Sequence, residues 1–295
     1  MKKISPLLKP VVLTSLLAAA ISCQAQTAAP AEAAASAPET SPFTANVNLT
    51  TKYKFRGQDQ GNTNWFSPAL QGGFDWSQNG WYVGNWNSNV SFSNAAIEMD
   101  FYGGYKGEIV KDLGYDVGIL QYYYPQKNKT IDFNVTELYG ALSYSFYSLK
   151  YSHTVSKDYF GIGEAQSQAA TGAGVGIGRP KGRNTGYLDL SGNFPIVDKW
   201  TLNAHVGYTR YSKDLRDASY TVPGGIAKAQ MLRGTGLPGS TVDLGVPNFY
   251  DYKLGATYDL GSGFSAAGAW VGANKKNFYG DINKARAIFT ISKTM

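Results

Sequence analysis

Apolar and polar side chains alternate along the stretch FTANVNLTTKYKFRG, which begins at Phe43 and ends at Gly57. The odd positions, among them Phe43, Val47 and Leu49, are almost all apolar, and the even positions are all polar or charged. A period of two is the spacing of a β-strand with two different faces. A soluble sheet packed on a core produces the same pattern as a barrel wall in lipid. The remaining features decide what the apolar face meets.

The alternation returns along the rest of the chain, and clusters of Gly, Asn and Pro separate the repeats. In NFYDYKLGATYDL, for example, the apolar set includes Tyr250, Leu254 and Tyr258. No segment shows a convincing helical period of 3.6 residues. We therefore expect twelve strands, at 43–57, 67–77, 81–93, 95–107, 114–124, 135–146, 148–157, 183–194, 199–212, 248–260, 262–274 and 284–295.

The connections between these expected strands differ in length according to their order. Every second connection is a compact turn, such as 78–80 and 261–263, whereas the other set contains the long loops 158–182 and 213–247. Tight turns at one end and long loops at the other are typical of bacterial outer-membrane barrels, which have an even number of strands. A soluble sandwich has no reason to separate its loops in this way.

Aromatic residues recur eight positions apart on the apolar faces, as in the pairs Tyr115 and Tyr123, and Trp200 and Tyr208. In a tilted strand eight residues rise roughly 20 Å, which approaches the distance between the two aromatic girdles of a membrane barrel. We predict an all-β fold, a transmembrane antiparallel up-and-down β-barrel of about 12 strands. Its apolar faces meet lipid, and its Asn, Thr, Ser, Gly and charged side chains point inward.

The N-terminus has the pattern of a secretory signal peptide. Lys2 and Lys3 precede a short apolar segment at 11–21 and the small-residue exit SCQAQ, and we place cleavage after Ala25. Residues 1–25 are thus the expected signal peptide, 26–42 a flexible Ala/Pro-rich leader and 43–295 the barrel. The single cysteine, Cys23, is either lipidated or discarded with the signal, and the second interpretation is favoured.

Candidate enzyme and nucleic-acid sites are weak. Residues 43–295 carry about +5 net charge, spread along the chain without a basic run, which argues against nucleic-acid binding. The only histidines are His153, expected on the lipid side, and His205, expected in the lumen without an obvious Ser partner, so a Ser–His hydrolase is disfavoured. The run TGAGVGIGRPKG at 171–182 does not fit a phosphate loop and is interpreted as a mobile surface loop. We expect no enzymatic activity, no metal and no cofactor.

Three segments resemble the TorF-type porins, also called the Gcw_chp family, of Gram-negative bacteria: YKFRG at 53–57, ALQGGFDW at 69–76 and GWYVGNWNSNV at 80–90. The later strand layout follows the family more loosely to the end of the chain. The resemblance implies an exported outer-membrane barrel that passes solutes. It supplies neither a substrate nor catalytic residues.

Charged side chains are expected to line the outer half of the lumen and to set its selectivity. One group is basic and lies where the first and last strands meet, and the other is acidic and lies on strands four and six. The predicted lining residues are Lys52, Lys54, Arg56, Lys284, Arg286, Glu98, Asp100 and Glu137.

The sequence therefore predicts an outer-membrane channel for small hydrophilic solutes or ions. The alternative is a barrel whose lumen is plugged by salt bridges and which binds or adheres through its loops. Loops 158–182 and 213–247 either fold into the lumen or project outward. The expected partners are outer-membrane lipid and the solutes, and the sequence carries no signal for an oligomeric state.

Overall fold

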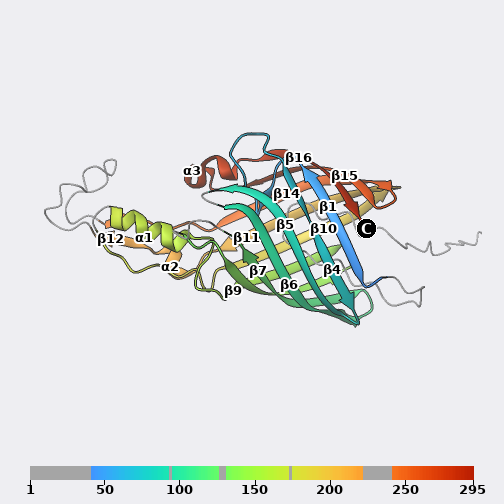
Figure 1. The fold of residues 1–295 in the computed structure, drawn as a ribbon, viewed down its shortest axis with the longest axis horizontal. Helices are drawn as coiled ribbons and strands as arrows, with labels where there is room; N and C mark the ends of the chain where they lie inside the picture. The colour runs from blue at the N-terminus through green and yellow to red at the C-terminus, as the bar shows by residue number, and fades with distance from the viewer. Residues whose placement is uncertain (1–40, 93–94, 126–130, 173–174, 222–240) are drawn as a thin grey trace, which may run out of the picture.

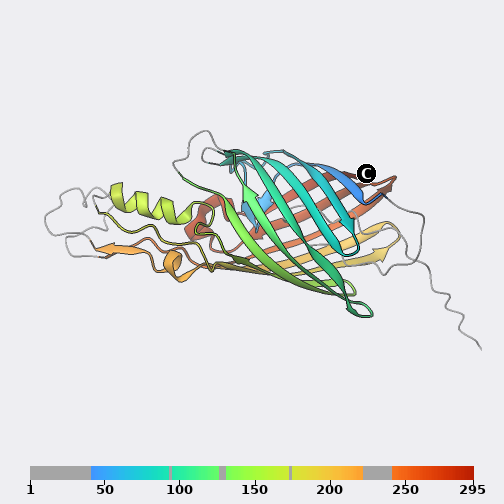
Figure 2. The same cartoon turned by 60° about the horizontal axis from the view of Figure 1, so that its bottom comes forward.

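The computed structural model describes residues 41–92, 95–125, 131–172, 175–221 and 241–295. Their dominant element is a closed antiparallel barrel in which each strand pairs with its two neighbours (Figures 1 and 2). The barrel strands, in chain order, are β1 (Phe43–Thr50), β4 (Ala69–Gln78), β5 (Trp81–Phe92), β6 (Ala95–Val110), β7 (Leu113–Tyr123), β8 (Val135–Tyr144), β9 (Tyr147–Thr154), β10 (Gly186–Val197), β11 (Trp200–Arg210), β14 (Phe249–Gly261), β15 (Phe264–Ala273) and β16 (Arg286–Thr294).

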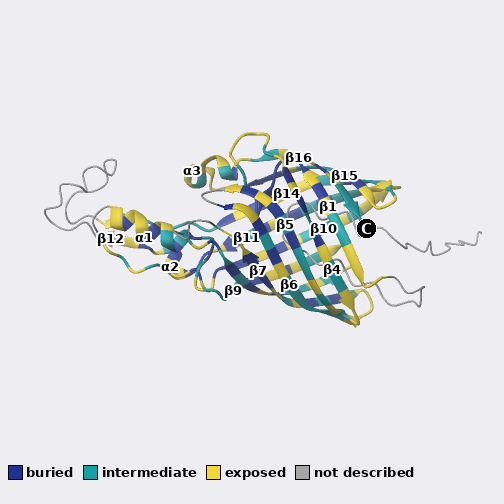
Figure 3. Ribbon diagram, viewed as in Figure 1, coloured by how far each residue is buried: buried dark blue, intermediate teal, exposed yellow. Residues whose placement is uncertain are grey.

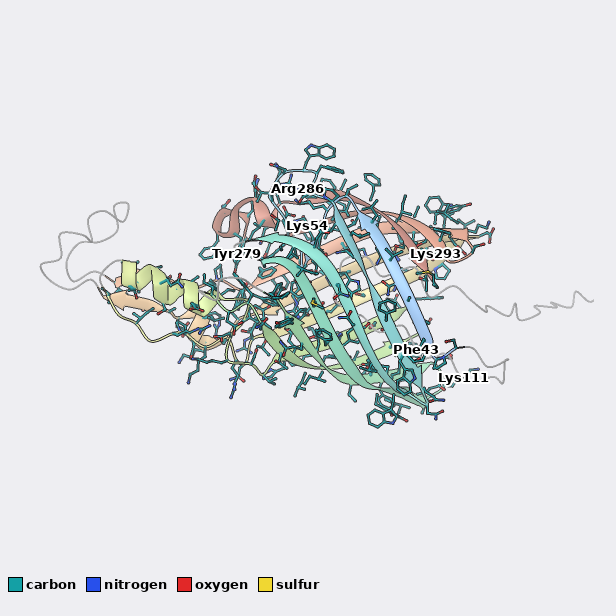
Figure 4. The ribbon with its side chains drawn as sticks, viewed as in Figure 1. Phe43, Lys54, Lys111, Tyr279, Arg286 and Lys293 are labelled. Atoms are coloured by element: carbon teal, nitrogen blue, oxygen red, sulfur yellow. The ribbon has the colours of Figure 1, made fainter. Side chains whose placement is uncertain are left out.

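The barrel confirms the twelve expected strands and their up-and-down order, with β1 closing the wall between β4 and β16. The turns at one end are tight, and two of them use left-handed pairs, Asn79–Gly80 and Ser262–Gly263, which suit the twist of a short hairpin. Phe43 and the C-terminal residues lie at this turn end (Figure 4). The long connections all leave the opposite end, called here the long-loop end.

The outer wall is apolar and the inner wall is polar. On β14, Leu254 is 59% exposed on the outside, while Asp251 and Thr257 are buried inside. Figure 3 shows this alternation over the wall as exposed and buried positions in turn. No core exists outside the barrel to cover the exposed Leu, Ile, Val and Phe side chains of the described strands, and closure leaves no unpaired strand edge. The fold is a transmembrane β-barrel.

The first strand is shorter than expected. The alternation continues to Gly57, but β1 ends at Thr50, and residues 51–60 turn into the barrel instead of extending the wall. Two short strands in this segment, β2 (Lys54–Phe55) and β3 (Gln58–Asp59), pair with each other and not with the barrel. The placement of Lys52, Lys54 and Arg56 on the first strand was therefore wrong.

The long-loop end carries helices that the sequence pattern did not predict. Beyond the barrel, a lobe projects that contains α1 (Ile162–Gly172), α2 (Lys213–Arg216), β12 (Ser219–Thr221) and β13 (Thr241–Asp243) (Figure 1). Two further short helices, α3 (Lys276–Tyr279) and η2 (Gly280–Asn283), precede β16. Among the described residues, none of the helices is both long enough and apolar enough to cross a membrane.

Two parts of the predicted chain layout lie outside the described residues. These are the signal peptide at 1–25, with Cys23, and nearly all of the leader at 26–42. The centre of loop 213–247, at 222–240, is likewise outside the description.

Candidate functional site

Residues 51–60 form a hairpin that enters the lumen from the long-loop end, and we call this segment the inner hairpin. Its turn, Arg56–Gly57, has positive φ at both residues (47° and 73°), as a two-residue type I′ turn requires. Gly57 lies against the wall at β14 and β15, because a Cβ added there would be 2.6 Å from the Asp251 Cβ on β14 and 2.6 Å from the Gly272 carbonyl oxygen on β15. No larger residue fits this turn without moving it.

Arg56 at the hairpin turn is held by the opposite part of the wall. Its Nη2 donates to both carboxylate oxygens of Glu137 on β8, at 3.0 and 2.8 Å, and its Nη1 donates to the Tyr159 hydroxyl at 2.8 Å. The guanidinium also lies over the Tyr187 ring, 4.1 Å from the centroid. Burial raises the pKa of Tyr159 to about 12, so its hydroxyl stays protonated at neutral pH. Charge, hydrogen bonds and ring contact together fix this side chain.

A second ion cluster, centred on Asp59, lies at the base of the inner hairpin, and most of its members belong to the hairpin. The Lys54 Nζ is 2.7 Å from Asp59 Oδ1, the Lys52 Nζ is 3.3 Å from Asp59 Oδ2, and Arg286 on β16 lies 3.9 Å from the same oxygen. Figure 4 shows Lys54 and Arg286 in the same region of the barrel, toward the long-loop end. The predicted clustering of basic residues is therefore confirmed for these three, with an acid at the centre.

The other two members of the predicted basic group do not join this cluster. Arg56 crosses the lumen to Glu137, for the reason given above. Lys284 lies in the approach to β16 and not on the strand, and its side chain is exposed. Strand β16 begins two residues later than the alternation suggested, because the helical turn at 280–283 occupies the approach to it.

The acidic wall lies where the sequence placed it. Glu98 and Asp100 on β6 and Glu137 on β8 all point inward and are almost fully buried. Glu98 accepts hydrogen bonds from Tyr53 of the inner hairpin, at 2.6 Å, and from Tyr124. Asp100 is different, because neither of its carboxylate oxygens has a hydrogen-bond partner within the described part of the chain.

Aromatic side chains fill the lumen around the inner hairpin. Tyr53 packs edge-on against Trp86 of β5, with ring centroids 5.7 Å apart. Phe55 packs against Tyr122 and Phe160 at 5.4 and 5.5 Å. Because these contacts reach β5, β7 and the segment after β9, while Gly57 touches β14 and β15, the inner hairpin spans the lumen. In this conformation it obstructs the outer half of the barrel.

A polar cluster below the inner hairpin surrounds His205. The His205 Nε2 lies 2.8 Å from Asp251 Oδ1, and its Nδ1 lies 3.1 Å from Asp189 Oδ2. Ser191, which pairs directly with His205 across β10 and β11, places its Oγ 3.2 Å from Nδ1. The expectation that His205 lacks a Ser partner was wrong, because the serine lies on the neighbouring strand. His153 is on the lipid side, as expected, beside Tyr151 and Asn184.

The Ser191–His205 pair is poorly arranged for catalysis. A catalytic histidine must have one ring nitrogen free to accept the serine proton. Here both nitrogens face carboxylates, and the Ser191 hydroxyl donates to Asp189 at 2.6 Å. A histidine that donates from both nitrogens is a cation and cannot act as a base. Among the described residues, no group of three His, Cys, Asp or Glu side chains is placed to hold a metal ion.

The two long loops form the lobe outside the barrel. In loop 158–182, Arg179 pairs with Asp158 and Glu164, each at 2.9 Å, which anchors the Gly-rich run to α1. Gln166 of α1 donates to the carbonyl oxygens of Leu215 and Leu244, both at 2.8 Å, and so joins the two loops. The loops therefore meet outside the barrel through α1, whereas Tyr159 and Phe160, at the start of the first loop, contact the inner hairpin in the lumen.

Sequence reasoning missed three residues that hold the inner hairpin, namely Asp59, Tyr159 and Tyr187. The signal for Asp59 was present in KFRGQD, where the Gly-containing pair Arg56–Gly57 can form a two-residue turn that brings Asp59 opposite Lys54. No local signal pointed to Tyr159 or Tyr187, because each meets Arg56 through the fold alone.

Comparison with known proteins identifies the family. Residues 32–231 match the family model described as "Bacterial protein of unknown function (Gcw_chp)", and the chain belongs to this family. No curated protein matches the sequence significantly.

Several solved barrels are similar in fold. The KdgM porin matches with a TM-score of 0.47 and 6% identity, over 85% of this chain and 97% of that one. The NanC porin matches with a TM-score of 0.47 and 9% identity, over 85% and 98%. OprD of Pseudomonas aeruginosa matches with a TM-score of 0.35 and 13% identity, over 88% and 67%.

Proposed function

We propose that this member of the Gcw_chp family is an outer-membrane channel for small hydrophilic solutes or ions, and that the inner hairpin is its gate. The observation that carries the proposal is the way the hairpin is attached. The β1 ladders with β4 and β16 end at Thr50, and of the hairpin backbone only its ends, Thr51 and Gln60, bond to wall strands, so we expect the wall to stay closed whether residues 53–59 are in or out. The tip and base of the hairpin are held through ion pairs and polar contacts, which water and ions can replace, and only its middle, at Tyr53 and Phe55, packs through aromatic contacts.

The polar interior supports a path for water-soluble molecules. Charged or polar side chains on β6, β8, β9, β10, β11 and β14 face inward, among them Asp100, Lys150 and Asp189. A barrel that served only as an anchor would need no such charges, and charged walls are what set selectivity in pores. Once the inner hairpin leaves, these groups line the path.

Planar-bilayer recording of the full-length mature protein tests the channel. We expect discrete openings for the wild-type barrel, and longer or more frequent openings for Arg56→Gln, because the contact with Glu137 is weakened. Lys284→Gln, which removes an exposed charge outside the lumen, is the matched control and should behave as wild type. Full insertion of folded barrels without any conductance, even for Arg56→Gln, would reject the channel.

The location is tested separately. We propose export by the signal peptide and residence in the outer membrane, where the apolar outer wall meets lipid and the long-loop end faces outward. In fractionated cells the mature protein should appear in the outer-membrane pellet without roughly its first 25 residues. Recovery as a soluble periplasmic protein would contradict this.

A second candidate function is a non-transporting barrel that binds or adheres through its loops. It is favoured by one observation: the lobe is an ordered structure, with α1 joined to the neighbouring loop through Gln166. The two candidates differ in the bilayer experiment, since only the channel conducts. A barrel hydrolase is a weaker alternative, for the reason given at His205.

A further inference from the structure

The outer wall of β5 breaks the rule that the rest of the barrel follows. Its outward positions are Trp81, Val83, Asn85, Asn87 and Asn89, and the three asparagines follow one another along the strand. Trp86, the large apolar residue between them, points inward against Tyr53. The general expectation that apolar side chains face lipid and Asn faces inward was therefore wrong on this strand. No other described barrel strand carries three successive polar residues on its outer face.

The asparagine row, defined as Asn85, Asn87 and Asn89, lies at the depth of the hydrocarbon band. Trp81 packs edge-on against Tyr105 near the turn end, as girdle aromatics do. Asn85 and Asn87 follow it by four and six residues, which corresponds to a rise of roughly 10 and 15 Å within a band of about 25 Å.

The neighbours of the row on the outer wall confirm that it does not lie at the rim. Asn85 stands between Phe74 of β4 and Phe101 of β6, which are 69% and 46% exposed. Asn87 stands between Gly72 and Met99. The row is thus a polar stripe within an apolar surface, and Gly72 beside it allows a close approach of another backbone.

Contacts within the chain satisfy these amides in part. Asn85 and Asn87 bond to each other, the closer contact being 2.6 Å, and Asn87 also donates to the Gly72 carbonyl at 3.3 Å. Asn85 donates to the Asp100 carbonyl at 3.0 Å, and Asn89 accepts from the Leu70 N–H at 2.7 Å and donates to the Pro68 carbonyl at 3.2 Å. Each amide oxygen still has an unused lone pair, because an amide offers two donors and two acceptor sites. Lipid tails supply no partner for them, and polar groups in hydrocarbon are costly without one.

We propose that the outer face of β4, β5 and β6 is a dimer interface, and that a second copy of this chain covers the asparagine row. Two copies in one membrane share their orientation, so a two-fold axis between them runs along the membrane normal. Such an axis places each residue opposite its own copy at the same depth. An amide both donates and accepts, so a row of asparagines is complementary to itself, which a row of like charges is not.

The apolar residues beside the row give two barrels little reason to associate in a membrane, so the asparagines would provide the driving force. Phe74, Phe101 and Leu70 are equally well accommodated by lipid tails, so they provide little reason to associate. Polar side chains that hydrogen-bond across a membrane interface provide that reason, and small residues let the backbones come close. Rotation of an Asn side chain exchanges an internal bond for one across the interface without a net loss. The inference does not depend on whether the lumen conducts.

Cysteine cross-linking in native outer membranes tests the interface. In a Cys23→Ser background, Asn87→Cys should form a disulfide-linked dimer on mild oxidation, because the axis brings the two copies of this position together. Val206→Cys on β11, which is more exposed than Asn87 but on the opposite side of the barrel, is the control and should stay monomeric. Equal cross-linking of both variants, or a product with a different protein, would overturn the proposal.

A second variant separates association from folding. Replacing Asn85, Asn87 and Asn89 together by Leu removes the row while keeping the wall apolar, so the barrel should fold and its mass in mild detergent should change from dimer to monomer. If the wild type is a monomer in detergent and in membranes, or if the triple variant keeps the wild-type mass, the row faces lipid and the proposal fails.

Discussion

Arg56 and Glu137 lie 81 positions apart in the chain and meet inside the barrel, with the guanidinium Nη2 2.8 Å from one carboxylate oxygen. The pair joins the turn of the inner hairpin to β8, across the lumen from the strand that the hairpin follows. The second contact of the turn is steric, because Gly57 rests against β14 and β15. The position of the hairpin therefore depends on this ion pair and this close approach, together with the Asp59 cluster at its base and the aromatic contacts of Tyr53 and Phe55.

The close approach gives the first prediction. In Gly57→Ala the new methyl group would lie 2.6 Å from the Asp251 Cβ and from the Gly272 carbonyl oxygen, so the turn must move away from the wall. Single-channel recording should show a higher open probability than for wild type. Gly280→Ala is the control: its φ of 68° also puts a side chain at positive φ, but a Cβ added there meets no atom within 4 Å. If both variants behave alike, backbone strain and not the wall contact matters.

The second prediction concerns the two faces of β14. Leu254→Arg places a charge in the hydrocarbon region and should lower the free energy of unfolding by about 2–4 kcal/mol. Lys253→Arg introduces the same side chain at the adjacent inward position and should change stability little. Urea unfolding of barrels in lipid vesicles measures both. Comparable losses would mean that the faces of β14 are assigned wrongly. Gly255 is unsuitable as the inward control, since a Cβ there meets the Ala269 Cβ at 2.6 Å.

The third prediction distinguishes a structural from a catalytic His205. His205→Ala leaves Asp189 and Asp251 buried without their shared partner, which should cost about 3–5 kcal/mol of stability. Ser191→Ala removes only a hydroxyl and should cost about 1 kcal/mol. Thermal unfolding in detergent gives both values. Esterase activity toward a short-chain ester that disappears in Ser191→Ala, in a barrel that remains folded, would show that the pair is catalytic.

The sequence was sufficient to predict the barrel, because period two and alternating loop lengths are local properties that lipid on one side and water on the other impose on every strand. It was not sufficient for residues 51–57. There the same alternation serves an inward hairpin, and the partners that select the hairpin, Glu98 and Glu137, lie on distant strands.

Strand β5 shows the second limit of the pattern. Trp86 points inward because Tyr53 of the inner hairpin offers it an aromatic partner, and the asparagines consequently point outward. The acidic residues were placed correctly for a simple reason: β6 and β8 keep a regular alternation around Glu98, Asp100 and Glu137. Most of the basic residues were placed wrongly, because they precede or follow a barrel strand instead of lying on it.

The last prediction concerns ion selectivity and rests on Asp100. In the closed conformation the basic residues of the inner hairpin neutralise acids, but Lys54 and Arg56 are carried away when the hairpin leaves. Glu98 and Asp100 belong to β6 and stay, so the open lumen should be anionic at this level and prefer cations. Asp100→Asn combined with Glu98→Gln should move the reversal potential under a salt gradient toward that of an unselective pore. The shift should be larger at low salt, where screening is weaker.

Glu108→Gln, which removes an exposed carboxylate near the turn end, is the control and should leave the reversal potential unchanged. A wild-type channel that prefers anions would show that the hairpin cations remain in the path when it conducts.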